Sequence, residues 1–405
     1  MRTDLGWRLD PDVAFLNHGS YGACPTPVLE RQQALRQRME WEPVRFLTGN
    51  LPALLEAARR DVAAFLRADP EGLAFVTNAT TGVNAVLQSL RFEPGDELVT
   101  NDHEYNATIN AMRAVAIRDG ARLVIARIPF PISGPDEARG AILGAVTERT
   151  RLVFVSHVTS PTALVLPVHE LVAELNRRGI DTLVDAAHAP GMVPVDVDGL
   201  GAAYWTANGH KWLCGPKGSA VLWVRADRRD RIHPLVVSHG ANDPGTDQSR
   251  FRAEFDWVGT QDPTAFLALP AAIEWMAACA PGGWPEVMAA NHALAVHGRD
   301  RIAAALGVEP PAPDSMVGSM AALPVPRLSD EAAAKALGKS LELEDGLQVP
   351  LGGWPVRAAW TDHGPEKVLI RISAQRYNEP ADYERLAEAL VKRLGPGQGR
   401  LATDA

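Results

Sequence analysis

The sequence predicts an α/β fold, in which a large domain built on a mostly parallel sheet is joined to a smaller α+β domain. Between about residues 70 and 225, short apolar runs alternate with helical patterns, as in parallel strands connected by helices. After about residue 265, long alanine-rich helical stretches replace this alternation. The 405 residues also exceed the size at which one core usually stops growing. We therefore expect a large domain at 31–265, and a small domain formed by 266–405 together with an N-terminal arm, 1–30.

The predicted strands are short runs that are almost continuously apolar, which suits strands buried on both faces of a sheet. They lie at 73–76, 97–100, 123–126, 152–156, 182–185, 203–206 and 220–224. Apolar residues at helical spacing follow some of these strands, at 81–90, 106–117 and 168–178. For the small domain we expect helices at 271–280, 286–306 and 381–394 and a strand at 368–373.

Charge and cysteine content exclude several classes of protein. The net charge is −9 and no cluster of lysine and arginine is large enough to supply a basic face, so a nucleic-acid partner is not expected. The three cysteines form no CxxC pair, which is typical of free thiols in a reducing compartment. The N-terminus lacks the apolar segment of a signal peptide, and no apolar run approaches the ~20 residues of a membrane span. We expect a cytoplasmic protein with no membrane partner.

The most informative segment contains Asp185, His188, His210 and Lys211. Asp185 ends a predicted strand, and ligands of open α/β sheets bind at the carboxyl ends of strands. Lys211 follows a later strand, in a glycine-bounded loop directly after His210. A buried lysine amine can attack an aldehyde, and a carboxylate can hold a pyridinium nitrogen protonated. Alternatively, Asp185 caps a helix and Lys211 lies on the surface. The combination favours a pyridoxal 5′-phosphate (PLP) site with Lys211 as its Schiff-base lysine.

A second candidate site lies where the strand at 73–76 runs into a helix. Thr80 and Thr81 precede Gly82 there, and their amides and hydroxyls could bind a phosphate at the helix N-terminus. The alternative is a threonine that merely caps the helix. Neither a dinucleotide fingerprint nor a P-loop is present, and His103-Glu104 is not followed by the second histidine of a zinc protease. We expect no metal.

Six motifs are spread over most of the chain in a single order. They resemble the class-V aminotransferase family of fold-type-I PLP enzymes, and within that family they most resemble the isopenicillin N epimerase-like branch. They are FLNHGSYG from Phe15, DHEYNA from Asp102, SHVTSPTA from Ser156, VDAAHAPG from Val184, NGHKW from Asn208 and GTQDP from Gly259.

The resemblance implies a PLP site and assigns its residues. Lys211 carries the cofactor, Asp185 pairs with the pyridine nitrogen and His188 lies near the ring hydroxyl. A further set would contact the phosphate or the ring: Thr80, Thr81, Thr159, Asn208 and His210, with His103 stacked on the ring. Thr260 would reach the phosphate of a neighbouring subunit, which implies a homodimer with its sites at the interface.

On the substrate side, the resemblance places the carboxylate clamp of an amino-acid-like substrate at Arg371, because a planar guanidinium binds a carboxylate bidentately. Arg376 fits a surface position better. Tyr105 is expected to be a second member of the site and an acid or base; the alternative is a packed core tyrosine. The residues expected to close over the substrate are Asn17, His18, Ser20, Tyr21 and Arg45.

The expected reaction begins with abstraction of the substrate's α-proton. Return of the proton to the opposite face would make an epimerase of secondary metabolism, the preferred interpretation. Loss of a β-substituent would make a C–S lyase acting on an S-conjugated cysteine; decarboxylation and transamination are weaker alternatives. Desulfuration through a persulfide is disfavoured because no cysteine follows Cys279. A non-enzymatic PLP sensor is disfavoured because the first 50 residues show no DNA-binding pattern.

Overall fold

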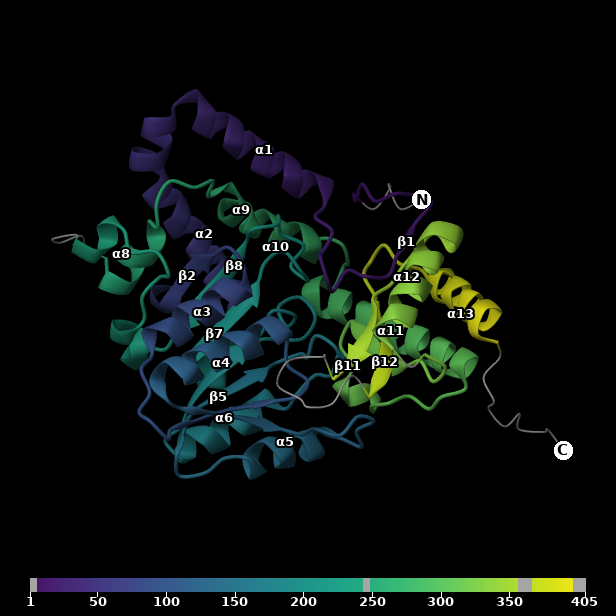
Figure 1. Cartoon of the computed structure of the whole chain (residues 1–405). Helices are drawn as coiled ribbons and strands as arrows, with labels where there is room; N and C mark the ends of the chain where they lie inside the picture. The colour runs from purple at the N-terminus through teal and green to yellow at the C-terminus, as the bar shows by residue number, and fades with distance from the viewer. Residues whose placement is uncertain (1–5, 243–247, 329, 356–365, 396–405) are drawn as a thin grey trace.

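The computed structural model describes residues 6–242, 248–328, 330–355 and 366–395. Two sheets with their helices lie side by side, the larger to the left in Figure 1 and the smaller to the right. The helices are α1 Thr26–Trp41, α2 Leu51–Leu66, α3 Ala79–Ser89, α4 Asn106–Asp119, α5 Pro135–Gly144, α6 Val168–Arg177, α7 Val197–Leu200, α8 Arg250–Asp256, α9 Thr264–Leu267, α10 Leu269–Ala277, α11 Gly283–Leu306, α12 Glu331–Asp345 and α13 Pro380–Leu394.

The larger sheet has seven strands in the order β2-β8-β7-β6-β5-β3-β4. The strands are β2 Leu73–Val76, β3 Glu97–Asn101, β4 Arg122–Ala126, β5 Thr150–Ser156, β6 Asp181–Asp185, β7 Tyr204–Asn208 and β8 Ala220–Val224. β3 to β7 pair in parallel, and β8 runs antiparallel to both of its neighbours, β7 and β2. The expected mostly parallel sheet is confirmed, and all seven predicted strands are present.

Alternate residues of the central strands enter two different cores. On β5, Leu152 and Phe154 pack with α3 and α4, whereas Val153 and Val155 pack on the opposite face with α2 and α6. The same alternation separates Leu183 from Val184 on β6. Both faces are therefore apolar, which is why these strands are continuous apolar runs in the sequence.

The smaller sheet is antiparallel, in the order β11-β12-β9, and packs against α11, α12 and α13. Its strands are β9 Met320–Pro324, β11 Leu351–Trp354 and β12 Lys367–Ser373. The N-terminal strand β1, Ala14–Phe15, pairs in parallel with β10, Leu347–Gln348, and so lies with the small domain. These separate cores support the proposed division into a large and a small domain. The boundary after residue 30 would cut α1, so we propose that the arm ends before Thr26.

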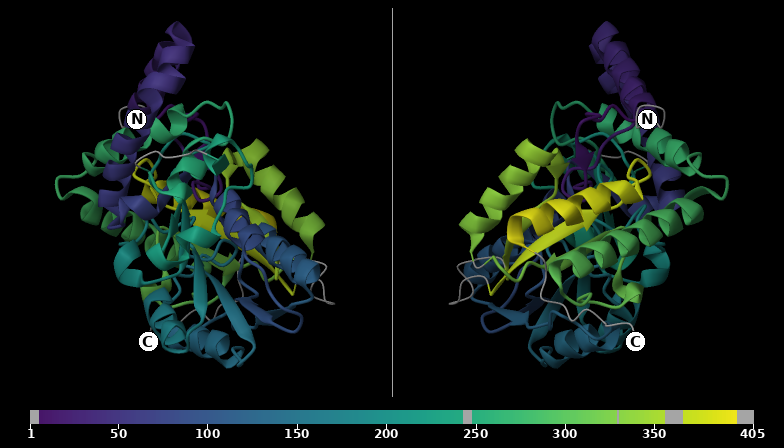
Figure 2. Two further views of the ribbon diagram at one scale, coloured as in Figure 1. Left: turned by 90° about the vertical axis from the view of Figure 1, so that its left-hand side faces the viewer. Right: turned by 90° about the vertical axis from the view of Figure 1, so that its right-hand side faces the viewer.

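Helix α1, which the sequence pattern did not predict, extends outward from the rest of the molecule (Figure 2). Only Val28, Gln32 and Leu35 of its sixteen residues are buried, so its apolar residues form no pronounced stripe. Trp41 at its end is 85% exposed and Val44 beyond it is 75% exposed. The helix therefore offers uncovered apolar surface near its C-terminal end.

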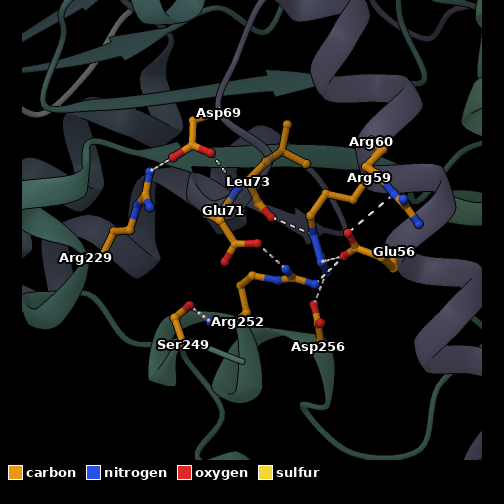
Figure 3. A network of polar contacts seen from close by, with 10 residues as sticks. All are labelled: Glu56, Arg59, Arg60, Asp69, Glu71, Leu73, Arg229, Ser249, Arg252 and Asp256. Carbon is orange, nitrogen blue, oxygen red and sulfur yellow. Dashed lines mark hydrogen bonds and ion pairs between the residues drawn. The ribbon is translucent and has the colours of Figure 1, made fainter. Parts of the chain in front are cut away.

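A network of charged side chains ties α2 to β2 and α8 (Figure 3). Arg59 is fully buried; its Nε donates to the Leu73 carbonyl at 3.0 Å, and its guanidinium pairs with Asp256 and Glu56. Arg252 of α8 pairs with Glu56 as well. Removing one partner of a buried ion pair costs about 3–5 kcal/mol, so this network fixes α8 against the sheet.

Candidate active site

A pocket of about 390 Å³ opens at the carboxyl edge of the seven-stranded sheet. This volume lies in the range of small-molecule sites, about 300–1,000 Å³. Loops that follow β2, β3, β5, β6 and β7 form one side, and the N-terminal arm and β12 form the other. The lining residues are Gly19, Ser20, Tyr21, Asn78, Ala79, Thr80, Tyr105, Ser156, Val158, Ser160, Asp185, Ala187, His188, Asn208, His210, Lys211 and Arg371.

Asp185 is the last residue of β6 and is 6% exposed. Its Oδ1 accepts a hydrogen bond from the Ala187 amide at 2.9 Å, and the segment that follows is not helical. Burial raises the pKa of the Asp185 carboxyl, whereas the Ala187 amide and the nearby Lys211 amine lower it. The carboxylate therefore lines the pocket and does not cap a helix.

Lys211 lies in the turn after β7 and points into the pocket. Its Nζ is 2.9 Å from Nε2 of His188, so it is not a surface lysine. Burial lowers the pKa of Lys211 to about 7; Asp185 acts in the opposite direction, and Arg371 lowers it further. A substantial fraction of this amine is therefore neutral, and hence nucleophilic, near neutral pH.

The N-terminus of α3 supplies an anion-binding position. Asn78 caps the helix by accepting the Thr81 amide at 2.8 Å, and Asn208 accepts the Ala79 amide at 2.9 Å. The amide and hydroxyl of Thr80 have no hydrogen-bond partner among the described residues and line the pocket. The Thr81 hydroxyl is held by Thr77 and Asn78 instead, and Thr81 does not line the pocket. The cap is therefore an asparagine, and one of the two predicted threonines is available to a ligand.

His210 also lines this end of the pocket. Its Nδ1 donates to the Ser219 carbonyl at 3.0 Å, which fixes the orientation of the ring. Burial lowers the pKa of His210 to about 4, so the ring is neutral in the cofactor-free protein.

Arg371 reaches the pocket from β12, on the opposite side. It is 9% exposed, and its guanidinium donates to the carbonyl and hydroxyl of Ser160 and to the hydroxyl of Ser20. Its Nε is buried without a partner, and no carboxylate pairs with it among the described residues. Burial lowers the pKa of Arg371 to about 10. The pocket therefore contains a buried cation that forms no ion pair with a carboxylate of the described residues.

His103 does not lie at the pocket, and this corrects the expectation that it stacks on the cofactor. The side chain is fully buried, with Nδ1 2.7 Å from the Thr162 hydroxyl and Nε2 3.0 Å from the Ile128 carbonyl. Its ring packs edge-on against Trp354. Tyr105, two residues later, lines the pocket and is 48% exposed, so it is not a core tyrosine.

Other predicted residues lie outside the pocket, so their contacts stay predictions. Thr159 is buried, and its hydroxyl accepts the Leu164 amide at 2.8 Å. The buried side-chain oxygen Oδ1 of Asn17 has no partner among the described residues. Arg45 is exposed and pairs with Glu42. Thr260 is exposed in the loop after α8. Tyr21, which was also expected on the substrate side, lines the pocket and is 74% exposed.

Sequence reasoning assigned no role to Ser156 or to Glu104 behind it. Ser156 ends β5 beside Asp185, and its amide and hydroxyl both donate to the fully buried Glu104 carboxylate. Burial raises the pKa of Glu104 to about 7, and Asp185 raises it further. Ser20, which was expected on the substrate side, lines the pocket. Ser156 lies in a quoted motif, but only three-dimensional contact assigns it to the pocket.

The donor set fits pyridoxal phosphate. Asp185 can hold a protonated ring nitrogen, Lys211 can bond to the aldehyde carbon, and the Thr80 amide and hydroxyl can bind the phosphate. The described residues include no group of three or more histidine, cysteine or acidic side chains that could hold a metal ion. Across the same residues, no helix is long and apolar enough to cross a membrane.

Comparison with known proteins agrees with this geometry. The family model for aminotransferase class-V matches residues 24–386. Isopenicillin N epimerase of Amycolatopsis lactamdurans is 37% identical over 94% of this chain and 95% of its own length. The enzyme of the same name from Streptomyces clavuligerus is 36% identical, again over 94% and 95%. A probable chloroplastic L-cysteine desulfhydrase of Arabidopsis thaliana is 31% identical over 94% of this chain and 83% of its own.

Solved structures share the fold. A mutant of the protein C-DES with glycine covalently linked to its PLP cofactor superposes with a TM-score of 0.80 at 22% identity, covering 94% of this chain and 96% of that one. The cystine C–S lyase C-DES in complex with cysteine persulfide superposes with a TM-score of 0.79 at 24% identity, covering 96% and 98%. The model match, the relatives and the pocket together show that this chain is a PLP-dependent enzyme and belongs to the class-V aminotransferase family.

Proposed function

We propose that the protein is an amino-acid epimerase, similar to isopenicillin N epimerase, that removes and returns the α-proton of a small amino-acid-like substrate. The observation that carries this proposal is the Arg371 guanidinium, buried in the same pocket as Lys211 without a carboxylate partner among the described residues. A buried cation is costly unless an anion pairs with it. The α-carboxylate of an amino acid supplies that anion and matches the planar fork of arginine.

The proposed roles of the protein groups follow from their positions. Lys211, whose burial lowers its pKa to about 7, takes the α-proton, because a general base is most effective when its pKa is near the working pH. Epimerisation also needs an acid on the other face of the substrate. The Tyr105 hydroxyl is the proposed acid, since it lines the pocket and comes from a different loop. Tyr21 of the N-terminal arm is proposed to cover the substrate.

When bound, pyridoxal phosphate supplies the electron sink that makes bonds at the α-carbon of an amino acid labile. Asp185 would hold the ring nitrogen in its protonated form, and His188 would lie beside the ring hydroxyl. Thr80, with Asn208 and His210, would bind the phosphate at the N-terminus of α3.

A second candidate function is a C–S β-lyase acting on an S-conjugated cysteine. It is favoured by relatives named L-cysteine desulfhydrase at 31–32% identity, below the 36–37% of the epimerases. Both functions share the removal of the α-proton and differ in whether a β-substituent then leaves. A persulfide route has less support, because none of Cys24, Cys214 and Cys279 lines the pocket. Burial also raises the pKa of all three thiols.

We also propose that the active form is a cytoplasmic homodimer. The uncovered apolar side chains Trp41 and Val44, together with Val237, which is 79% exposed, support an interface between copies of the chain. Exposed Thr260 is available to reach the phosphate in a neighbouring copy. A role in secondary metabolism is proposed only from the similarity to the epimerases.

The test is product analysis of the cofactor-loaded enzyme with a panel of amino acids and S-substituted cysteines. Inversion at the α-carbon, measured by chiral chromatography with no keto acid formed, supports the epimerase. Pyruvate and a free thiol would establish the lyase and overturn the epimerase proposal. Lys211→Ala serves as the inactive control in both assays.

A further inference from the structure

Trp212 follows the lysine directly and contacts His188, the side chain to which Lys211 is hydrogen-bonded. Its indole Nε1 lies 3.3 Å from Nδ1 of His188, while Nε2 of the same histidine lies 2.9 Å from Lys211 Nζ. Trp212 is 0% exposed and His188 is 2% exposed, so water does not compete for the contact between indole and imidazole. The three side chains form a row that runs from the buried indole through the buried imidazole to the pocket-lining amine.

The chemistry of the donors fixes the direction of both hydrogen bonds. An indole N–H donates and never accepts, so Nδ1 of His188 must be the acceptor. Burial holds the pKa of His188 well below its usual value, with Lys211 lowering it further, so the ring is neutral and carries a single proton. That proton is therefore on Nε2, which faces Lys211. An ammonium group has no acceptor, whereas a neutral amine has one lone pair.

We propose that Trp212 is a positioning residue that holds His188 in the Nε2–H tautomer, so that His188 donates to the Lys211 amine and favours its neutral form. The inference rests on the proposed role of Lys211, because the neutral amine is the form that can attack a carbonyl carbon. After loading, the same tautomer would present a donor to the hydroxyl oxygen of the cofactor ring.

The remaining groups around this row do not set the tautomer. Lys211 also faces Asp185, which favours the ammonium, and Arg371, which disfavours it. His18 and His210 lie near His188, and burial lowers the pKa of His18 to about 3 and of His210 to about 4, so both are neutral. The position of Trp212 is itself fixed. Its ring packs against His18, with centroids 4.8 Å apart, and a Cβ added at Gly191 would lie 2.5 Å from its carbonyl oxygen.

The test uses cofactor-free protein with ¹⁵N-labelled histidine, and the His188 signals are assigned by their absence in His188→Gln. In the unaltered protein, NMR is expected to show a proton on Nε2 and none on Nδ1. In Trp212→Phe, which keeps a ring but loses the N–H, we expect the Nδ1–H tautomer to become populated. Trp223→Phe is the matched control, since the buried Trp223 N–H has no partner among the described residues.

A second readout is the pKa of Lys211, followed with ¹³C-labelled lysine. Trp212→Phe is expected to raise the pKa of Lys211 by about one unit. At a pH well below this pKa, that shift lowers the fraction of neutral amine roughly tenfold. Combined with His188→Gln, whose amide has no tautomers, Trp212→Phe should shift this pKa little. A proton on Nδ1 in the unaltered protein would overturn the inference even if no variant folds. The NMR readouts need no cofactor, so a protein that binds no pyridoxal phosphate but shows the Nε2–H tautomer would contradict the proposed function and support this inference.

Discussion

The two sides of the pocket are assembled in different ways. The lysine side, which consists of Asp185, His188 and Lys211, comes from one short stretch of chain on the neighbouring parallel strands β6 and β7. The arginine side, which consists of Ser20, Tyr21 and Arg371, joins the N-terminal arm to β12, and its Ser20–Arg371 hydrogen bond spans 351 residues. The lysine side is thus set by local sheet geometry, whereas the arginine side depends on how separate cores pack.

This difference separates cofactor chemistry from substrate recognition. A change on the lysine side should remove cofactor attachment while the arginine side stays intact. A change on the arginine side should weaken substrate binding while the cofactor stays in place.

Lys211→Ala should abolish covalent attachment of the cofactor and all turnover. The visible absorption band of the loaded enzyme disappears because no other lysine lines the pocket among the described residues. Lys217→Ala is the matched control in the same loop, with its own amine held at the Gly22 carbonyl. A visible band that persists in Lys211→Ala would contradict the assignment. Circular dichroism checks that the fold is retained.

Arg371→Ala should raise KM by roughly 10- to 100-fold, the loss expected for a charge-assisted hydrogen bond, with the visible spectrum nearly unchanged. Steady-state kinetics and absorption spectra measure the two effects separately. Arg376→Ala is the control, because that side chain is outside the pocket and contacts the Cys279 carbonyl. A normal KM in Arg371→Ala would argue against a carboxylate clamp.

Tyr105→Phe should lower kcat but not stability, whereas His103→Gln should lower stability with the cofactor still bound. Loss of the Tyr105 hydroxyl removes a proposed proton donor and should lower kcat by about 10²-fold or more while the protein stays stable. His103→Gln disturbs a buried hydrogen-bond pair and should lower the free energy of unfolding by about 1–3 kcal/mol with the cofactor still bound. Kinetics and urea unfolding measure these effects, and a lower kcat only in the His103 variant would reverse the assignment.

The stability of the cofactor-free protein should depend on Lys211 between about pH 7 and pH 10.5. Burial lowers the pKa of this lysine from 10.5 to about 7, so in that window the unfolded chain binds the extra proton. The stabilising contribution therefore grows as pH rises through the window, by at most a few kcal/mol. Urea unfolding of Lys211→Met should show a smaller increase over this range, and identical pH profiles would contradict the depressed pKa.

The sequence allowed the large sheet to be predicted in detail because burial on both faces leaves a direct pattern. Leu152 to Val155 must all be apolar when alternate residues enter two cores. Helix α1 was missed for the opposite reason, since few of its side chains are buried and its apolar residues lack a helical stripe. The strands β9 and β11 were missed as well; β11 contains two glycines and gives little strand pattern.

The candidate site was predictable where strand order places its residues, and not where a loop path or a tertiary contact does. Asp185 ends β6 and Lys211 follows β7, and the carboxyl ends of these neighbouring strands meet, so their proximity follows from sheet topology. His103 was misplaced because the side chain of this loop that enters the pocket is Tyr105, two positions further along the chain. No pattern in the sequence fixes the path of the loop after β3. Ser156 is a small polar residue, and only its contact with Glu104 distinguishes it from other serines.

Proton NMR of the loaded enzyme in heavy water, with candidate amino acids, tests directly whether Lys211 removes the α-proton. We expect the α-proton signal of a substrate to disappear by exchange for deuterium, at a rate that Lys211→Ala abolishes and Arg371→Ala reduces mainly through KM. Retention of the α-proton while the substrate is converted, for example by loss of its carboxylate, would contradict the claim that Lys211 removes that proton.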